Sequence, residues 1–558
     1  MQHSQRQPLL PQQALLPPNL HLDSRMQRRL LGGLLLLGVV LRLLRFALPF
    51  PLWGDECMLA VNFIHRSFAD MLRPLEYHQI APLGFLWAEL AAVKLGGFHT
   101  WTLHLFPTLC SLAGLLVFAY LASRVLDGWP LVLATGTLAV AYYPIRHGAE
   151  VKQYAGDLLM SALLLALALR WYQRPEESRW LWFLVLAVPV ALVFSLPGVF
   201  VAGGVSLFVL FVLWQKRLGS RRLVGAWLVY NLVLVATFGV LLVVFIQPHR
   251  TPEVARGVAA WWREAFPPWH EPLRLPGWLV KIHFGRMFSY PVGGKDGGST
   301  LTTLGFLLGL AVLARQGRTR ALLVLALVPF ALALVAASMR RYPYGASART
   351  MLYLAPIIIL VAAVGWAWML QRLAGWFRTA RVMWLGVASP VVLGAALMLH
   401  MSMQPYKTPY DRDHDHFARW FWTQMSYQAE VVCVESELGE ELFGGQWIEF
   451  APEYRCYMHL YSPRHRRGEG PQWEAVSARH PLRCVVLSAP HVPYDRQALR
   501  RWLQRMQKRY ALVNYDVFPI NPHTDRFYAR RYEVYEFVPR EQVARYRRPF
   551  EDPVPVLR

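Results

Sequence analysis

Long apolar stretches alternate with short polar loops along most of the chain. The first runs from Leu30 to Leu52, and further stretches lie at about 101–124, 130–146, 154–172, 180–195, 198–214, 223–246, 301–315, 321–338, 351–370 and 384–402. A helix needs roughly 20 mostly apolar residues to cross the hydrocarbon core of a bilayer. The pattern therefore predicts an α-helical polytopic membrane domain over residues 30–403, with about eleven transmembrane helices.

The apolar stretch between residues 180 and 214 allows two interpretations. The sequence Ser-Leu-Pro-Gly at 195–198 favours a tight turn between two short helices. If residues 180–214 instead form one broken helix, every loop that follows changes sides of the membrane.

Both ends of the chain differ from this central part. Residues 1–29 are rich in Gln, Pro and Leu, which predicts a disordered tail. Beyond residue 404, short apolar segments alternate with polar ones, and a basic helix is expected at 497–510. The expected strands are 431–435, 455–461, 484–487, 511–517 and 532–537. This alternation predicts a small α/β domain over residues 404–558.

The distribution of charge sets the expected orientation. The net charge is +23, and the short loops at 215–222, 315–320 and 372–381 are basic. They fall on the same side as the N-terminal tail, so the positive-inside rule places that tail in the cytoplasm and the C-terminal domain outside. We expect a multi-pass protein of the plasma (inner) membrane with a periplasmic C-terminal domain. Contact of basic loops with anionic membrane lipids explains the charge, and the sequence contains no nucleic-acid-binding motif.

Two adjacent carboxylates, Asp55 and Glu56, follow the first apolar stretch directly and open an outer loop expected at 53–100. Carboxylates at the rim of a membrane are costly, so they are more often functional than decorative. The local alternative is that Asp55 caps a helix and Glu56 occupies its first turn. The amphipathic pattern over residues 56–72 predicts a helix that lies along the membrane surface.

Charged residues gather in two further outer loops. One of them, which we call the charged turn, comprises residues 146–154 and offers four candidates for substrate binding: Arg146, Glu150, Lys152 and Tyr154. The other loop precedes the apolar stretch at 351–370 and contains Arg341 and Arg349. The planar fork of Arg binds the oxygens of a phosphate in pairs. The alternative for the charged turn is an interfacial turn whose long side chains reach for water.

Three features have alternatives that the residues alone leave open. Arg42 and Arg45 lie in the first apolar stretch, and their side chains either extend to the interface, which we favour, or face a cavity near Asp55. The three C-terminal cysteines allow a disulfide if that domain faces an oxidising compartment; they are Cys433, Cys456 and Cys484. The run of Asp and His at 411–416 either ligates a metal or begins an amphipathic helix, which we favour.

With these pieces in order, the chain resembles the GT-C superfamily of membrane glycosyltransferases. Within it, the chain is most similar to the branch of protein O-mannosyltransferases and lipid A aminoarabinose transferases. Four segments carry the resemblance: Gly54–Glu56, His78–Leu83, the charged turn and the entry to a late span at Arg349–Pro356. The second is similar to a His-Pro-Pro-Leu stretch of that branch, from which Gln79-Ile80-Ala81 departs. The resemblance covers about residues 1–400.

The resemblance implies a transfer of sugar from a polyprenyl-phosphate donor to a hydroxyl of a lipid, glycan or protein acceptor at the outer membrane face. Asp55 is then the expected general base, and a one-step displacement inverts the anomeric centre. The phosphate leaving group needs positive charge, from Lys152, Arg146 or Arg349. The remaining expected site residues are Glu56 and Glu150, which would orient the acceptor or hold a divalent cation, and the substrate-binding residues His78, Tyr154 and Arg341.

Two other classes of function are alternatives. A transporter or flippase of a lipid-linked glycan should have internal repeats and broken helices near the midplane, and the sequence shows no clear repeat. A scaffold for glycan assembly would use the membrane part as an anchor, for which about eleven spans with charged outer loops are excessive.

Overall fold

The computed structural model describes residues 22–48, 50–294, 297–315, 319–345, 347–377, 379, 381–423, 430–433, 450–462, 481–488, 493–519 and 531–545. The chain folds into two compact units. The membrane unit comprises residues 1–48, 66–95 and 101–404, and the C-terminal unit comprises residues 49–65, 96–100 and 405–558. The segment that contains Asp55 and Glu56 therefore folds with the C-terminal residues.

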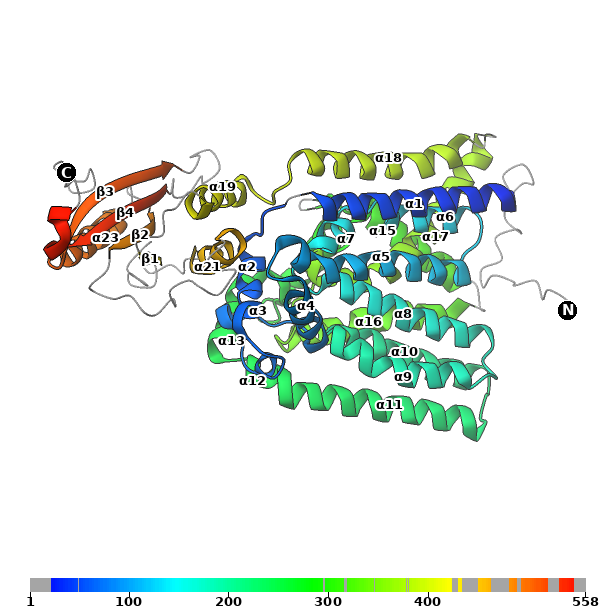
Figure 1. Cartoon of the computed structure of the whole chain (residues 1–558). Coiled ribbons are helices and arrows are strands. Elements are labelled where there is room, and N and C mark those ends of the chain that lie inside the picture. The colour runs from blue at the N-terminus through cyan, green and yellow to red at the C-terminus, as the bar shows by residue number, and fades with distance from the viewer. Residues whose placement is uncertain are drawn as a thin grey trace. The chain divides into compact units, whose positions relative to one another are not determined.

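The membrane unit is a bundle of helices that run side by side (Figure 1). Within the described residues, eight helical segments are long and apolar enough to cross a membrane: α1 (Ser24–Ala47), α5 (Thr100–Val125), α8 (Tyr154–Gln173), α10 (Gly198–Gln215), Arg221–His249 with α11 (Arg221–Leu241), α16 (Arg320–Ser338), Arg349–Trp376 with α17 (Ala355–Trp376), and α18 (Arg381–Met403). Three shorter apolar helices join them: α6 (Trp129–Ala139), α9 (Arg179–Phe194) and α15 (Thr300–Arg315). The polytopic helical architecture expected from hydropathy is confirmed.

The helix boundaries differ from the expected spans at two places. Helix α1 begins at Ser24, inside the expected tail, because the Asp23 carboxylate accepts from the backbone N–H of Arg25 at 3.1 Å and caps it. Residues 1–21 lie outside the described residues. The expected span 130–146 ends at Ala139, and a separate short helix, α7 (Tyr142–Arg146), follows.

Arg42 explains why α6 ends there. Its guanidinium donates to the carbonyls of Leu138 at 3.1 Å and Ala139 at 3.1 Å, so a side chain satisfies the last carbonyls of the helix. Arg42 and Arg45 are buried, with 3% and 7% of their surface exposed, so the prediction that they extend to the interface was wrong.

The tight turn predicted near residue 196 is confirmed. Helices α9 and α10 are separate elements that pack against one another. The Ser195 hydroxyl accepts from the backbone N–H of Gly198 at 3.1 Å, a local bond that favours a turn over a continuous helix.

The single surface helix expected over residues 56–72 was wrong. The segment breaks into α2 (Gly54–Ala60), α3 (Asn62–His65) and a 3-10 turn, η2 (Asp70–Leu72). The Asn62 amide donates to the carbonyls of Met58 at 3.1 Å and Leu59 at 3.2 Å, which diverts the backbone from a continuous helix. Most of α2 is buried, so it does not lie on a surface.

The C-terminal unit contains a four-stranded sheet with the order β1-β2-β4-β3. Its strands are β1 (Glu430–Cys433), β2 (Leu482–Ser488), β3 (Tyr510–Pro519) and β4 (Arg531–Pro539). Strands β1 and β2 are parallel, whereas β4 is antiparallel to both β2 and β3. Helix α23 (Pro493–Gln507) packs its Trp502 and Leu503 against the sheet. The expected α/β character is confirmed.

One expected strand, 455–461, is instead part of helix α21 (Phe450–Tyr461). The less buried positions Arg455 and His459 are four residues apart, which is the spacing of one face of a helix. The aromatic and sulfur-containing residues between them pack on the other faces. Their composition suggested a strand, whereas the spacing of the less buried positions is that of a helix.

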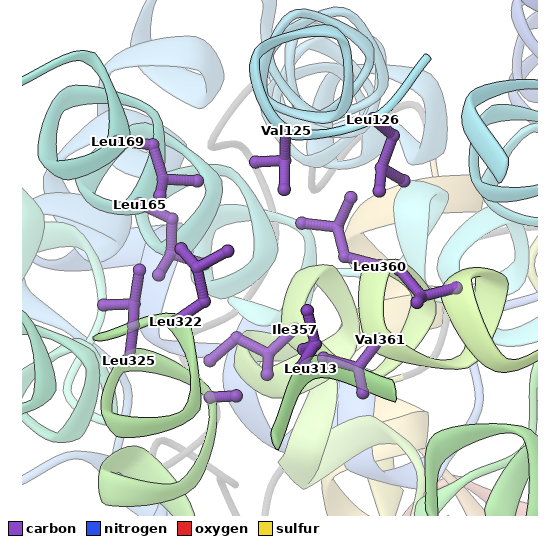
Figure 2. A pocket seen from close by; sticks show the side chains of 12 residues that line it. Val125, Leu126, Leu165, Leu169, Leu313, Leu322, Leu325, Ile357, Leu360 and Val361 are labelled. Carbon is purple, nitrogen blue, oxygen red and sulfur yellow. The ribbon is translucent and has the colours of Figure 1, made fainter. Parts of the chain in front are cut away.

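A small cavity lies within the helix bundle of the membrane unit (Figure 2). Its volume is about 50 Å³, and all twelve residues around it are apolar, among them Leu165, Leu313 and Ile357. Because no lining side chain offers a hydrogen bond or a charge, this space is a packing void and not a site for a polar substrate.

The closest helix packing in the membrane unit joins α15 and α17. A Cβ atom placed on Gly365 would lie 1.9 Å from the carbonyl oxygen of Gly305, and one on Gly309 would lie 2.0 Å from that of Val361. Gly305 and Gly309 are four residues apart, the spacing by which small residues let two membrane helices approach. This contact fixes α17, which is preceded directly by the segment 349–354 that contains Arg349.

We expect Gly365→Ala to destabilise the membrane unit by about 1–3 kcal/mol or more, because the added methyl group forces the two backbones apart. Thermal unfolding of the detergent-solubilised protein, followed by tryptophan fluorescence, should show a lower Tm. Gly375→Ala is the matched control, since the same helix leaves open space there. Equal melting temperatures for the two variants would contradict the close contact.

Candidate functional site

The acidic pair lies at the start of α2. The helix has Trp53 as its N-cap residue, and the Glu56 carboxylate accepts from the backbone N–H of Trp53 at 3.3 Å. Glu56 is 2% exposed and thus holds the first turn together, as half of a capping box does. Asp55 is the second residue of the helix and is partly exposed, so the alternative that Asp55 is the N-cap was wrong.

Helix α21 fixes the backbone on both sides of the pair. The Tyr457 hydroxyl donates to the carbonyl of Leu52 at 2.7 Å, and the Cys456 thiol donates to the carbonyl of Cys57 at 3.3 Å. The ammonium of Lys407 lies over the Trp53 ring. The acidic residues therefore sit on a short helix whose ends are held by residues of the C-terminal part of the chain.

Asp411 is a third carboxyl group near the pair. It belongs to α19 (Pro409–Thr423) and accepts from the Thr408 hydroxyl and backbone N–H, each at 2.7 Å. Burial raises the pKa of Asp411, and the negative charge of Glu56 adds to this, against the Thr408 hydrogen bonds and Lys407. Asp411 therefore binds a proton more tightly than an exposed carboxyl group does.

The run 411–416 forms the start of α19, as the favoured alternative for it predicted. Three of its other acidic and histidine side chains have protein partners: Asp413 pairs with Arg412 at 3.0 Å, Asp415 with Arg419 at 2.7 Å, and His414 with the Tyr532 hydroxyl. Among the residues that the structure describes, no three His, Cys, Asp or Glu side chains are arranged to hold a metal ion. The divalent cation stays a prediction.

The charged turn belongs to the membrane unit and is organised around Glu150, which is 1% exposed. One carboxylate oxygen of Glu150 lies 2.7 Å from Nδ1 of His147, and the other lies 3.7 Å from Nε of Arg146. Arg146 also donates to the Tyr142 hydroxyl at 2.5 Å. The interfacial alternative, in which these side chains reach for water, was wrong for Arg146 and Glu150, because their charges are paired inside the protein.

The protonation of the turn follows from burial and from Glu150. Burial lowers the pKa of His147 below its usual range, although Glu150 opposes this, so the imidazole is neutral at pH 7. Burial alone would lower the pKa of Arg146, but Glu150 and Tyr142 raise it overall. The charged turn thus combines the guanidinium of Arg146 and the ammonium of Lys152 with the carboxylate of Glu150, which pairs with Arg146.

Lys152 is 6% exposed and contacts a residue that sequence analysis did not select. Its ammonium donates to the side-chain oxygen of Gln79 at 2.7 Å. Gln79 follows Tyr77 and His78, whose φ angles of 53° and 56° lie in the left-handed region that few non-glycine residues adopt. His78 is exposed, so the neighbouring Gln79 is the residue directed at the charged turn.

Arg349 opens the 3-10 turn η10 (Arg349–Leu354) before α17. Its guanidinium carbon lies 6.0 Å from the centre of the Tyr154 ring and 5.7 Å from that of Trp262. The Tyr154 ring packs edge-on against His147 at 5.4 Å. The structure thus brings Arg349 and Tyr154 together with the charged turn.

Arg341 occupies a different position. It is exposed and its charge acts on Arg250, whose guanidinium donates to the carbonyl of Arg340 at 2.9 Å. The expected site residues are therefore distributed: Asp55 and Glu56 belong to the C-terminal unit, whereas His78, Arg146, Glu150, Lys152, Tyr154, Arg341 and Arg349 belong to the membrane unit.

Buried groups of α1 and α5 support the charged turn from within. Arg42 donates to the Ser111 hydroxyl at 3.0 Å, and Arg45 donates to the carbonyl of Arg146 at 3.5 Å. A Cβ atom on Gly148 would lie 2.4 Å from the Ser111 hydroxyl oxygen. Sequence analysis missed this support, although two Arg residues within an apolar stretch were the available signal.

No protein-family model matches the sequence, and no curated protein matches it. Solved structures do match the fold. ArnT from Cupriavidus metallidurans bound to undecaprenyl phosphate superposes with a TM-score of 0.54 at 13% identity, over 90% of this chain and 97% of that one. The oligosaccharyltransferase AglB from Archaeoglobus fulgidus, in complex with an inhibitory peptide and a dolichol-phosphate, matches with a TM-score of 0.47 at 13% identity, over 89% and 73%. The chain thus shares the fold of ArnT, which confirms the GT-C-like architecture expected from the sequence.

Proposed function

We propose that the protein is an integral-membrane glycosyltransferase that moves a sugar from a polyprenyl-phosphate donor to an acceptor hydroxyl. The observation that carries the proposal is the charged turn, which holds the cations Arg146 and Lys152 and has Arg349 beside its Tyr154. Guanidinium and ammonium groups gathered in one place suit the oxygens of a phosphate. The solved structure of ArnT, which has the same fold, holds a polyprenyl phosphate, a ligand of that charge.

Each group has a role in the proposed step. The acceptor oxygen attacks the anomeric carbon, its proton passes to Asp55, and the bond from that carbon to the phosphate oxygen breaks. Lys152 and Arg349 stabilise the leaving phosphate, which needs no proton. A single displacement of this kind inverts the anomeric centre. Glu56 maintains the helix that presents Asp55, and the acceptor is a lipid, a glycan or a protein.

The membrane orientation is part of the proposal. The short loops at 215–222, 315–320 and 372–381 are basic and share a side, which supports a cytoplasmic N-terminus and an extracytoplasmic C-terminal unit in the inner membrane. A lipid-linked donor suits that outer face, because it reaches the site by diffusion within the bilayer.

Replacing Lys152 or Arg349 by Ala should weaken binding of undecaprenyl phosphate by about thirtyfold or more, since a charge paired with phosphate away from water is lost. Binding to the purified protein in detergent can be measured by ligand-dependent thermal shift or scintillation proximity. Arg274→Ala, which removes an exposed Arg paired with Glu271 at 2.7 Å, is the control. Unchanged affinity in both test variants would move the phosphate site elsewhere.

Glu150→Gln should lower the free energy of unfolding of the ligand-free protein by roughly 3 kcal/mol, because Arg146 loses its buried counter-ion. Added undecaprenyl phosphate should restore more stability to this variant than to the wild type, since it supplies the missing negative charge. Glu177→Gln is the control. It removes a carboxylate that pairs with two exposed residues, Arg174 and Arg179, and should change neither quantity. A smaller ligand-dependent stabilisation in the variant would show that Glu150 acts on the ligand in another way.

Asp55→Asn should reduce turnover by roughly a hundredfold or more while donor affinity stays nearly intact, because the variant keeps the shape of the side chain and loses the base. Initial rates at saturating donor, together with donor binding, measure the two effects. Glu56→Gln keeps a hydrogen-bond acceptor for Trp53 and should be milder. Near-wild-type turnover in Asp55→Asn would leave the proposed site without its base.

A further inference from the structure

Two cysteines lie together beside the acidic pair. Cys57 is in α2 and Cys456 is in α21, 399 residues apart in the chain, and both side chains are fully buried. The sulfur of Cys456 is 3.3 Å from the carbonyl oxygen of Cys57, and the two thiols also hydrogen-bond to each other. Both residues belong to the C-terminal unit.

The other cysteines with described side chains lie in different surroundings. Cys110 is in α5 of the membrane unit. Cys484 lies in β2, in the hydrophobic core formed with Trp502 and Tyr535. Cys456 packs against α2 instead. The geometry therefore favours a pairing of Cys456 with Cys57, whereas the sequence had allowed one among the three C-terminal cysteines. The side chain of Cys433 lies outside the described residues.

We propose that Cys57 and Cys456 form a disulfide that ties the helix of the acidic pair to the C-terminal part of the chain. The inference rests on the proposed extracytoplasmic location of this unit, since disulfides persist in oxidising compartments. The thiol contact provides the proximity, and the absence of a CxxC pair from the sequence argues against a metal or redox-exchange role for these residues.

The oxidant that the step requires is a protein disulfide of the extracytoplasmic thiol–disulfide exchange class. The thiolate of one cysteine attacks a sulfur of that disulfide and releases one oxidant thiolate, which gives a mixed disulfide. The thiolate of the second cysteine then attacks the sulfur of the first in this mixed disulfide. The Cys57–Cys456 bond forms and the other oxidant thiolate leaves. The two protons lost by Cys57 and Cys456 go to the two oxidant thiolates, and the oxidant gains two electrons.

The timing of the reaction follows from burial. Burial raises the pKa of Cys57 well above its usual range, and the hydrogen bond with Cys456 raises it further. A thiol in that state is a poor nucleophile. The bond therefore forms while the chain folds, before α2 is enclosed, and resists exchange afterwards.

The consequence for the site is a fixed orientation of α2. The Tyr457 hydroxyl already holds the carbonyl of Leu52 before the acidic pair, and a disulfide at Cys456 would hold the residue directly after it. Asp55 and Glu56 would then lie between a hydrogen bond and a covalent bond made by neighbouring residues of α21. Because small displacements of a catalytic group are costly, loss of the bond should lower turnover by roughly tenfold or more.

Peptide mapping of the full-length protein decides whether the bond exists. The protein is recovered from membranes of a host with an oxidising outer compartment, quenched in acid, treated with N-ethylmaleimide in denaturant and digested without reduction. We expect mass spectrometry to find the peptide of Cys57 linked to that of Cys456, with Cys110 and Cys484 alkylated. Recovery of both Cys57 and Cys456 as alkylated thiols, or a link from Cys456 to Cys433, would overturn the proposal.

Turnover and donor binding separate this inference from the proposed function. Cys57→Ser and Cys456→Ser should each lower turnover, leave undecaprenyl phosphate binding unchanged and make the remaining partner available for alkylation. Cys110→Ser is the control, because its thiol lies in the membrane unit. A linked peptide with unchanged turnover in both variants would overturn the role in positioning Asp55. Because the peptide map needs no activity, an inactive wild-type protein that carries the bond would count against the proposed reaction alone.

Discussion

The guanidinium of Arg42 closes the end of α6 by donating to the carbonyls of Leu138 and Ala139, and the charged turn follows from that point. The same side chain holds Ser111, against which Gly148 is packed. A buried Arg with all three guanidinium nitrogens donating to backbone or hydroxyl oxygens is a rigid element, because moving it would leave several polar groups unpaired inside the membrane domain. The position of Arg146 and Glu150 depends on this one interaction.

The charged groups of the turn have partners of different kinds. Glu150 pairs with Arg146, burial lowers the pKa of His147, and the ammonium of Lys152 donates to the neutral side-chain oxygen of Gln79. An amide oxygen orients an ammonium without cancelling its charge. A carboxylate at residue 79 would have made a neutral ion pair and left little field for an anion. Gln79 thus orients the ammonium of Lys152 without adding a negative charge beside it.

Hydropathy was sufficient to predict the helix bundle and the small α/β part, because burial in lipid or in a core leaves a strong periodic signal. It failed where one polar contact decides the structure. Arg42 was expected at the interface because the sequence does not show which carbonyls lie nearby. Residues 455–461 were expected as a strand because their composition outweighed their period. The sequence pointed to His78, whereas tertiary contacts select the adjacent Gln79.

The packing of Gly148 against Ser111 has an evolutionary consequence. These two positions, on a loop and on α5, share a space that holds one hydroxyl group and no further carbon atom. A side chain gained at position 148 while Ser111 is present would overlap with the Ser111 side chain. The change at position 111 must therefore come first. The pair should therefore vary together, and such coupled variation offers a way to recognise distant relatives that overall sequence similarity does not reveal.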